Sequence, residues 1–187
     1  CILCGCNKAV RPEKPDMEWW REARFGMFIH LGLYSVAAGQ WDGKDIDGIG
    51  EWIQNFAKIP NSDYEKLAAD FTLANYNPEE WVMLAKQAGA RYIVFTTKHH
   101  EGFCLYPSDV SDFDIERTPY KKDPLKELVE ACRKHDMKIG FYYSHRQDWR
   151  EEEAAVMKNE YDGHYGKPKS EVKPDFDSYI RKKALPQ

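Results

Sequence analysis

An α/β fold built on a parallel sheet is predicted by three features of the sequence. Short apolar segments alternate with segments of helical periodicity along most of the chain. The strand-like segments are apolar throughout, as expected where both faces of a strand are covered. No Gly-rich phosphate-binding loop follows the first of them, which disfavours a nucleotide-binding fold. The preferred architecture is therefore a parallel (β/α)8 barrel of the TIM type, and an open doubly wound sheet is the alternative.

The first predicted unit begins with a buried strand at residues 24–30. The segment that follows, residues 34–60, is long and rich in glycine, so we expect a functional loop there. Residues 62–71 have helical periodicity, and Asn61 or Ser62 is expected to cap that helix.

The middle of the chain carries the clearest signals. Asn77 and Pro78 are typical of a helix start, and Gly89 is typical of a helix end. The residues of this helix that we expect in the core are Trp81, Leu84, Ala85 and Ala88. Residues 92–97 form a continuously apolar, β-branched run and predict the second strand.

A second crossover helix is predicted at residues 123–135, followed by a strand at 138–144. Residues 146–173 are polar and are expected to form a loop, and 175–185 begin a further helix. The core positions expected in the second crossover helix are Leu125, Leu128, Val129 and Cys132. Because only three strands are predicted where a barrel has eight, we expect the chain to be the amino-terminal part of a longer barrel.

Composition excludes several classes of protein. The chain has 187 residues, of which 42% are hydrophobic and 31% charged, and this excludes a disordered tail, a collagen-like fibre and a multi-pass membrane protein. Its net charge of -4 disfavours a nucleic-acid binder, which would need a basic excess to neutralise phosphates. The high aromatic content of 14% suits a large core and a ligand with apolar faces.

The first six residues, C-I-L-C-G-C, contain three of the five cysteines. Residues 3–6, with the sequence L-C-G-C, resemble a bacterial lipobox in which Cys6 would carry the lipid. A redox or metal cluster is the alternative, but it lacks a partner set elsewhere in the sequence. We therefore expect residues 1–18 to be a signal remnant and tether, and residues 19–187 to be the folded domain. The protein would be exported to the periplasm, outer membrane or cell surface as a lipoprotein.

Side chains able to bind a ligand follow each predicted strand. His30 follows the first strand, and His99 and His100 follow the second. A tyrosine pair, Tyr142 and Tyr143, ends the third strand. Because the carboxyl ends of parallel barrel strands converge on one face, these groups are expected to share a site.

The residue types favour a sugar as the ligand. Neutral imidazoles and phenols both donate and accept hydrogen bonds, as vicinal hydroxyls require, and aromatic faces cover the C–H side of a sugar ring. Glu51 and Trp52, in the long first loop, add a carboxylate acceptor and a stacking ring. A metal site is the second interpretation, with ligands from His30, His99, His100 and Glu101. None of these residues is at the i, i+4 spacing that would place two ligands on one helix face.

The sequence resembles the alpha-L-fucosidase glycoside hydrolases over residues 19–149. Its most specific segment is Thr97-Lys98-His99-His100-Glu101-Gly102-Phe103. The other matching segments are Ala23-Arg24-Phe25-Gly26-Met27-Phe28-Ile29-His30, Gly32-Leu33-Tyr34-Ser35-Val36, Glu51-Trp52, Ala88-Gly89-Ala90-Arg91-Tyr92 and Phe141-Tyr142-Tyr143-Ser144. Two positions depart from the family pattern, with Leu31 in place of Trp and Glu101 in place of Asp.

The resemblance implies retaining hydrolysis of terminal alpha-L-fucose from glycans, with no metal or other cofactor. The residues that it implies for fucose binding are His30, Glu51, Trp52, His99, His100 and a tyrosine of the third strand. Tyr143 is favoured over Tyr142 because it lies closer to the strand end, although the pleat could reverse this choice.

The resemblance also implies that neither catalytic carboxylate lies in this chain. The family nucleophile is an Asp after the fourth strand, and the acid/base group comes later still. The aspartates after earlier strands, Asp112, Asp114 and Asp148, are expected to cap turns instead. We therefore expect this part alone to be inactive. A non-enzymatic alternative is a degenerate module that binds fucose without hydrolysing it.

Overall fold

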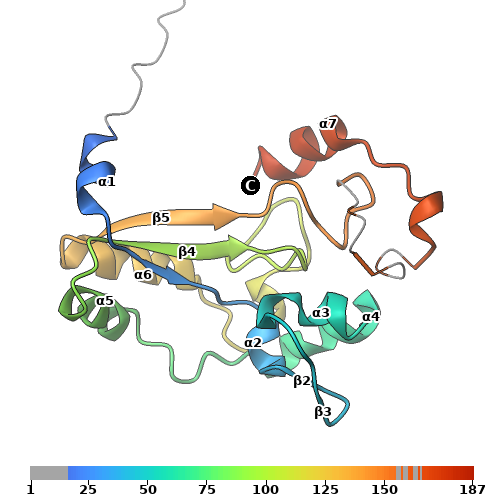
Figure 1. Cartoon of the computed structure of the whole chain (residues 1–187), viewed down its shortest axis with the longest axis horizontal. Coiled ribbons are helices and arrows are strands. Elements are labelled where there is room, and N and C mark those ends of the chain that lie inside the picture. Colours follow the sequence, from blue (N-terminus) through green and yellow to red (C-terminus); the bar gives the residue numbers. More distant parts are fainter. Residues whose placement is uncertain (1–16, 155–156, 158–159, 162–163, 165) are drawn as a thin grey trace, which may run out of the picture.

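The centre of the molecule is a three-stranded parallel sheet. The computed structural model describes residues 17–154, 157, 160, 161, 164 and 166–187. Strands β1 (Met27–Ile29), β4 (Tyr92–Lys98) and β5 (Lys138–Tyr143) pair in the order β1-β4-β5. All three strands point the same way in Figure 1, so their carboxyl ends meet at one edge of the sheet. The predicted α/β fold with a parallel sheet is confirmed for these three strands. Cys6 and nearly all of the expected 1–18 tether lie outside the described residues.

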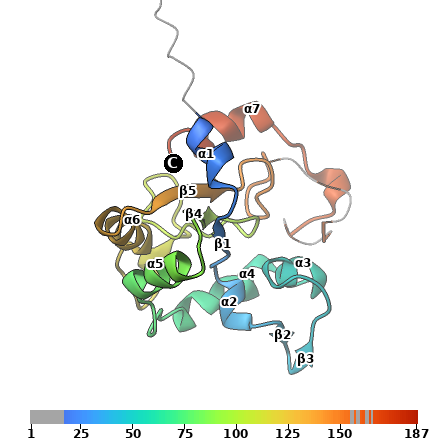
Figure 2. The same cartoon turned by 60° about the vertical axis from the view of Figure 1, so that its left-hand side comes forward.

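Two crossover helices cover one face of this sheet. Helices α5 (Pro78–Gln87) and α6 (Pro124–Lys134) contact each other and lie on the same side of the strands (Figure 2). Helix α5 begins with the predicted signal, and α6 begins in the same way, because the side chain of Asn77 or Asp123 accepts a backbone N–H and a proline occupies the first turn. The Trp81 ring lies 6.4 Å from that of Phe95 and joins α5 to β4.

Several core predictions for these helices need correction. Leu84 is 59% exposed and Ala88 is exposed as well, whereas α5 buries Val82 together with the predicted Ala85. In α6, Ala131 is buried beside the predicted Leu128 and Cys132, whereas Leu125 and Val129 are half-buried. Apolar spacing defines a wide stripe on a helix, and the packing against the sheet decides which edge of that stripe is covered.

The segment 34–60, where a functional loop was expected, contains several short helices and strands. It contains α2 (Tyr34–Ala37), the antiparallel pair β2 (Gln40–Trp41) and β3 (Lys44–Asp45), the 3-10 helix η1 (Gly50–Trp52) and α3 (Ile53–Phe56). These elements lie beyond the carboxyl ends of the strands (Figure 1). Their buried side chains, among them Tyr34 and Ile53, join the main core and anchor η1 over that edge.

The predicted helix 62–71 is divided in two, and its cap differs from the prediction. Helix α4 (Asn61–Tyr64) continues as the 3-10 helix η2 (Glu65–Asp70), and Pro60 precedes it without a side-chain cap. The Asn61 side chain donates instead to the backbone carbonyls of Trp149 and His164. The Asn61 side chain, predicted to cap the helix, is therefore used in a tertiary contact with the segment that follows β5.

The remaining elements are short helices before β1, in the connections between elements and after β5. Helix α1 (Glu18–Ala23) precedes β1, and the 3-10 helices η3 (Ile115–Arg117) and η4 (Lys169–Glu171) lie in the connections. Helix α7 (Phe176–Tyr179), capped by Asp175, continues as a π-helical turn over Ile180–Ala184. Within the described residues, no helix has the length and apolar character needed to cross a bilayer.

A bulge near the end of β4 changes which side chains face the site. Thr96 pairs with Tyr142, and Lys98 pairs with the next residue, Tyr143. Strand β4 therefore has one extra residue between these two pairs. In a regular strand Thr96 and Lys98 would share a face, whereas the extra residue turns Lys98 to the opposite face. His99 thereby comes to the same face as Tyr142, and their rings stack at 5.4 Å.

Candidate substrate-binding site

The histidines that follow β1 and β4 meet at the carboxyl edge of the sheet. The rings of His30 and His99 lie 5.7 Å apart, and those of His99 and His100 lie 4.1 Å apart. Tyr142 stacks on His99 and lies 6.5 Å from His30. Groups from three strands therefore line one surface, as the convergence of strand ends predicts.

Helix η1 adds the carboxylate and the indole ring expected from the sequence. Glu51 Oε1 lies 3.9 Å from His30 Nε2, and the Trp52 ring lies 5.3 Å from that of His100. Trp149 contacts Trp52 at the same ring distance of 5.3 Å and supports it from behind. The structure thus brings together all the predicted site residues that lie outside β5.

The tyrosine beside these residues is Tyr142, and Tyr143 is elsewhere. Consecutive strand residues point to opposite faces, and the pleat places Tyr142 on the histidine side. The Tyr143 ring instead lies 4.8 Å from Lys98 Nζ, and its hydroxyl donates to the Gln187 side chain. The contacts of Tyr143 therefore do not support its choice as the sugar-binding tyrosine, which was based on its position near the strand end.

Two of the site histidines are neutral at pH 7. Burial lowers the pKa of His99 to about 3, with His100, His30 and Lys98 adding repulsion. Burial also lowers the pKa of His100 to about 4. A neutral imidazole has one donor and one acceptor nitrogen, so each ring can hydrogen-bond to a hydroxyl through a nitrogen that is not already paired within the protein.

A buried carboxyl group lies directly behind His99. Glu101 is 1% exposed, and its Oε2 lies 3.8 Å from His99 Nδ1. Within the described part of the chain, neither Glu101 oxygen nor His99 Nδ1 has a hydrogen-bond partner. Burial raises the pKa of Glu101 to about 8, so the group is protonated at pH 7. A Cβ on Gly32 would lie 2.6 Å from Glu101 Oε1, so glycine at that position leaves room for the carboxyl.

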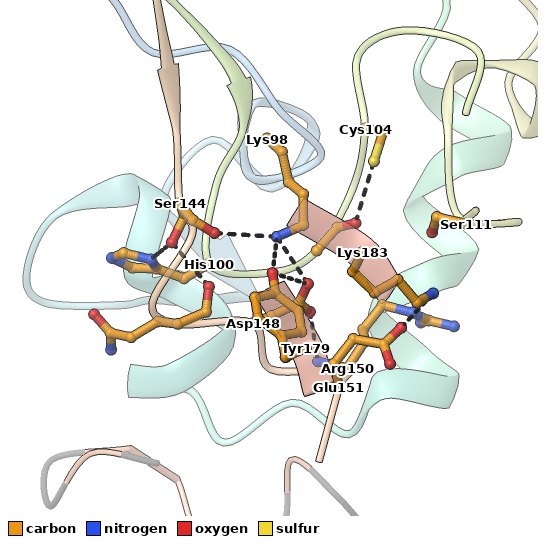
Figure 3. Close-up of polar contacts among 12 residues, drawn as sticks. Lys98, His100, Cys104, Ser111, Ser144, Asp148, Arg150, Glu151, Tyr179 and Lys183 are labelled. Carbon is orange, nitrogen blue, oxygen red and sulfur yellow. Dashed lines mark hydrogen bonds and ion pairs between the residues drawn. The ribbon is translucent and has the colours of Figure 1, made fainter. Parts of the chain in front are cut away.

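A buried ion pair lies on the opposite face of β4. Lys98 Nζ is 2.7 Å from Asp148 Oδ2, with the two side chains 2% and 3% exposed. Figure 3 shows Lys98 also reaching Ser144 and the hydroxyl of Tyr179, which itself donates to Asp148. Burial is the largest single influence and lowers the pKa of Lys98, but Asp148, Tyr143 and Cys104 together raise it, and the net pKa lies above its ordinary value. Sequence analysis missed this pair, although a lysine that ends an apolar strand was the available signal.

Gly102 offers a test of how tightly the loop after β4 is built around Asp148. Its φ is +83° and an added Cβ would lie 2.7 Å from Asp148 Oδ1, whereas Gly89 has φ +86° with nothing within 4 Å. We expect Gly102→Ala to lower the free energy of unfolding by roughly 2–4 kcal/mol, from left-handed strain together with the displaced carboxylate. Gly89→Ala should cost only the strain, roughly 1–2 kcal/mol. Urea denaturation of both variants measures the difference, and equal losses would contradict the close approach.

The metal-site interpretation fits the observed geometry less well. Glu101 is enclosed behind His99, so Glu51 rather than Glu101 joins the histidines. The ligand atoms of His30, Glu51 and His99 are separated by up to 4.8 Å. Ligands of a tetrahedral zinc site lie roughly 3.3 Å apart, given Zn–N distances of about 2 Å. The set of donors, acceptors and aromatic faces matches a small polyhydroxylated ring better.

The sequence is similar to a known protein family and to curated members of it. The sequence model of the family described as Alpha-L-fucosidase matches residues 7–187. Tissue alpha-L-fucosidase from Macaca fascicularis is 39% identical over an alignment of 165 residues that covers 76% of this chain and 35% of that protein. The corresponding protein from Homo sapiens is 38% identical over an alignment of 138 residues that covers 70% of this chain and 30% of its own length. The chain therefore spans about a third of the length of these curated relatives.

Solved structures are similar over nearly the whole chain. Unliganded alpha-L-fucosidase AlfC from Lactobacillus casei superposes with a TM-score of 0.82 at 37% identity, over 90% of this chain and 54% of its own. Alpha-L-fucosidase from Vibrio sp. strain EJY3 has a TM-score of 0.83 at 40% identity, over 91% of this chain and 29% of its own.

Proposed function

Because this chain belongs to the alpha-L-fucosidase family, we propose that it supplies the fucose-binding part of a retaining alpha-L-fucosidase. The observation that carries the proposal is the gathering of His30, Glu51 and His99 at one sheet edge, with ligand atoms within 4.8 Å of one another. Trp52 and His100 extend the same surface. AlfC has been solved in complex with alpha-L-fucose product and, as a variant, with Fuca(1,6)GlcNAc, which supports a fucosylated glycan as the substrate.

In this proposal the described residues bind and orient the sugar, and the two catalytic carboxylates come from later parts of the full-length protein. Neutral His99 and His100 hydrogen-bond to sugar hydroxyls, and the Glu51 carboxylate accepts from a hydroxyl donor. Trp52 covers the apolar side of the ring. A nucleophile and an acid/base group then carry out the double displacement on the sugar so positioned.

We also propose that the three strands belong to a (β/α)8 barrel. Among the described residues, β1 and β5 each pair only with β4, which leaves an open edge on both. Phe28 on the histidine face and Phe141 on the helix-covered face are 50% and 52% exposed. Further strands and helices would cover both rings, as expected when large aromatic side chains form part of a continuing core.

Export as a lipoprotein, with acylated Cys6, is part of the same proposal. The lipobox-like start of the chain supports it. Mass spectrometry of the protein recovered from its native membrane fraction would detect the acyl groups.

The test of the proposed function is hydrolysis of 4-nitrophenyl alpha-L-fucoside by the full-length protein. We expect turnover with retention of configuration and no loss of activity on treatment with EDTA. Binding of fucose without turnover would support the degenerate module instead, and loss of activity with EDTA would support the metal-dependent alternative.

The two tyrosines of β5 allow a matched test of which face binds the sugar. Tyr142→Phe is expected to lower kcat/KM about tenfold, because the Tyr142 ring stacks on His99 at the proposed site and the variant loses one hydrogen bond to substrate. Tyr143→Phe removes the same atom from the opposite face and should leave KM unchanged. Steady-state kinetics on both full-length variants would show the contrast. A larger KM effect at Tyr143 would restore the choice based on sequence.

A further inference from the structure

Ser144, which follows β5, is hydrogen-bonded to His100 in a way that determines the position of the imidazole proton. The Ser144 hydroxyl donates to the backbone carbonyl of Gln147 at 2.8 Å. The same oxygen lies 2.6 Å from His100 Nδ1. A hydroxyl has one hydrogen, and a carbonyl oxygen can only accept, so Ser144 Oγ must accept from His100. His100 Nδ1 therefore carries the proton, and Nε2 carries a lone pair.

The connections between the two strand ends fix this contact. The Ser144 N–H donates to the carbonyl of Lys98 at 2.9 Å, and Lys98 Nζ donates back to the carbonyl of Ser144 at 3.2 Å. The Trp149 N–H donates to the carbonyl of His100 at 2.8 Å. Figure 3 shows Lys98 between Ser144 and Asp148, with Ser144 directed at the imidazole of His100. The loops after β4 and β5 are thus held in one relative position.

The ring so oriented belongs to the proposed sugar-binding surface. The His100 ring lies between His99, at 4.1 Å, and Trp52, at 5.3 Å. Burial lowers the pKa of His100 to about 4, so the ring does not take up a second proton near pH 7. With Nδ1 occupied by Ser144, the ring offers the sugar an acceptor and no donor.

We propose that Ser144 is a positioning residue that sets the tautomer of His100, so that Nε2 accepts a hydrogen bond from a hydroxyl of the bound sugar. This inference rests on the proposed function, since it assigns a direction to one hydrogen bond of that site. It adds a residue that does not itself contact the sugar. Lys98 and Asp148 support it by holding the backbone of Ser144.

The first measurement is the long-range 1H–15N spectrum of the histidine rings in the full-length protein, with His100 assigned from a His100→Gln variant. We expect a protonated Nδ1 in the wild type and a shift toward protonated Nε2 in Ser144→Ala. Ser144→Thr keeps the hydroxyl and should restore the wild-type tautomer. Ser111→Ala is the matched control, because the Ser111 hydroxyl accepts the backbone N–H of Phe113 in a separate turn.

The second measurement is the kinetics of the same variants on an aryl fucoside. Ser144→Ala should raise KM about tenfold with a smaller change in kcat, because a donor replaces the acceptor in front of the sugar hydroxyl. Ser111→Ala should leave KM unchanged. A wild-type His100 protonated on Nε2, or a Ser144→Ala variant that keeps both tautomer and KM, would overturn the inference. Failure of the wild type to bind or hydrolyse fucosides would instead overturn the proposed function, because the spectrum does not depend on it.

Discussion

Replacing Lys98 with methionine is expected to lower the free energy of unfolding by about 3–5 kcal/mol, the usual cost of breaking a buried ion pair from one side. Lys98 Nζ lies 2.7 Å from Asp148 Oδ2, and both side chains are almost fully buried. The substitution leaves the Asp148 carboxylate in the interior without its cation, accepting from the Tyr179 hydroxyl and the backbone N–H of Arg150. Urea denaturation of the full-length protein measures the change.

Two further variants separate this effect from a general loss of packing. Lys98→Met combined with Asp148→Leu removes both charges and should recover most of the lost stability. Lys66→Met breaks an ion pair of the same length, 2.7 Å, between side chains that are 74% and 47% exposed. Because exposed pairs contribute little, this control should unfold almost as the wild type does. A Lys98→Met variant as stable as Lys66→Met would show that the buried pair is not a structural anchor.

Replacing Glu101 with glutamine is expected to change how stability depends on pH. Burial raises the pKa of Glu101 from 4.5 to about 8, with Asp148 and Glu51 adding to the rise and Lys98 opposing it. The hydroxyl groups of Tyr34 and Tyr64 also lie near the carboxyl, and His99 lies 3.8 Å away. The folded state therefore holds a proton that the unfolded state releases between these two pKa values.

The sign of the effect follows from proton linkage. Where the folded state binds more protons than the unfolded state, stability falls as pH rises. The contribution of Glu101 is complete below pH 4.5, declines from there and is lost once pH passes about 8. Relative to Glu101→Gln, the wild type should lose at most about 4 kcal/mol between pH 5 and pH 8, taking 1.36 kcal/mol per pKa unit.

The effect of Glu101 is read from the difference in unfolding free energy between wild type and Glu101→Gln at each pH. The difference is needed because the buried histidines change stability with pH in the opposite direction. The lowered pKa values of His99, His100 and His164 make stability rise with pH in both proteins, and this trend cancels on subtraction. Denaturation at several pH values between 5 and 8 provides the measurement. A constant difference between wild type and Glu101→Gln would mean that Glu101 is already ionised at pH 5.

The elements that sequence analysis predicted well are those whose signals are local. Asn77 and Asp123 cap α5 and α6 because a short polar side chain can reach backbone N–H groups three residues away. The central strand was predicted because both of its faces are covered and its side chains are correspondingly apolar. Asn61 carried a similar local signal, but its side chain is used in a contact with residues about a hundred positions later. Such a contact has no local trace.

Residue types and strand order were enough to predict that His30, His99 and His100 lie close together, and Glu51 and Trp52 lie beside them. Parallel strands must present their carboxyl ends at one edge, so position along the chain determined the neighbourhood. Only the tertiary structure decided which face of that edge each side chain occupies. One extra residue in β4 turns Lys98 away and His99 inward, and the pleat of β5 selects Tyr142. A bulge arises from pairing between strands far apart in the sequence, and a buried charge is stable only beside a partner brought from elsewhere. Neither condition can be met, or predicted, within one local segment.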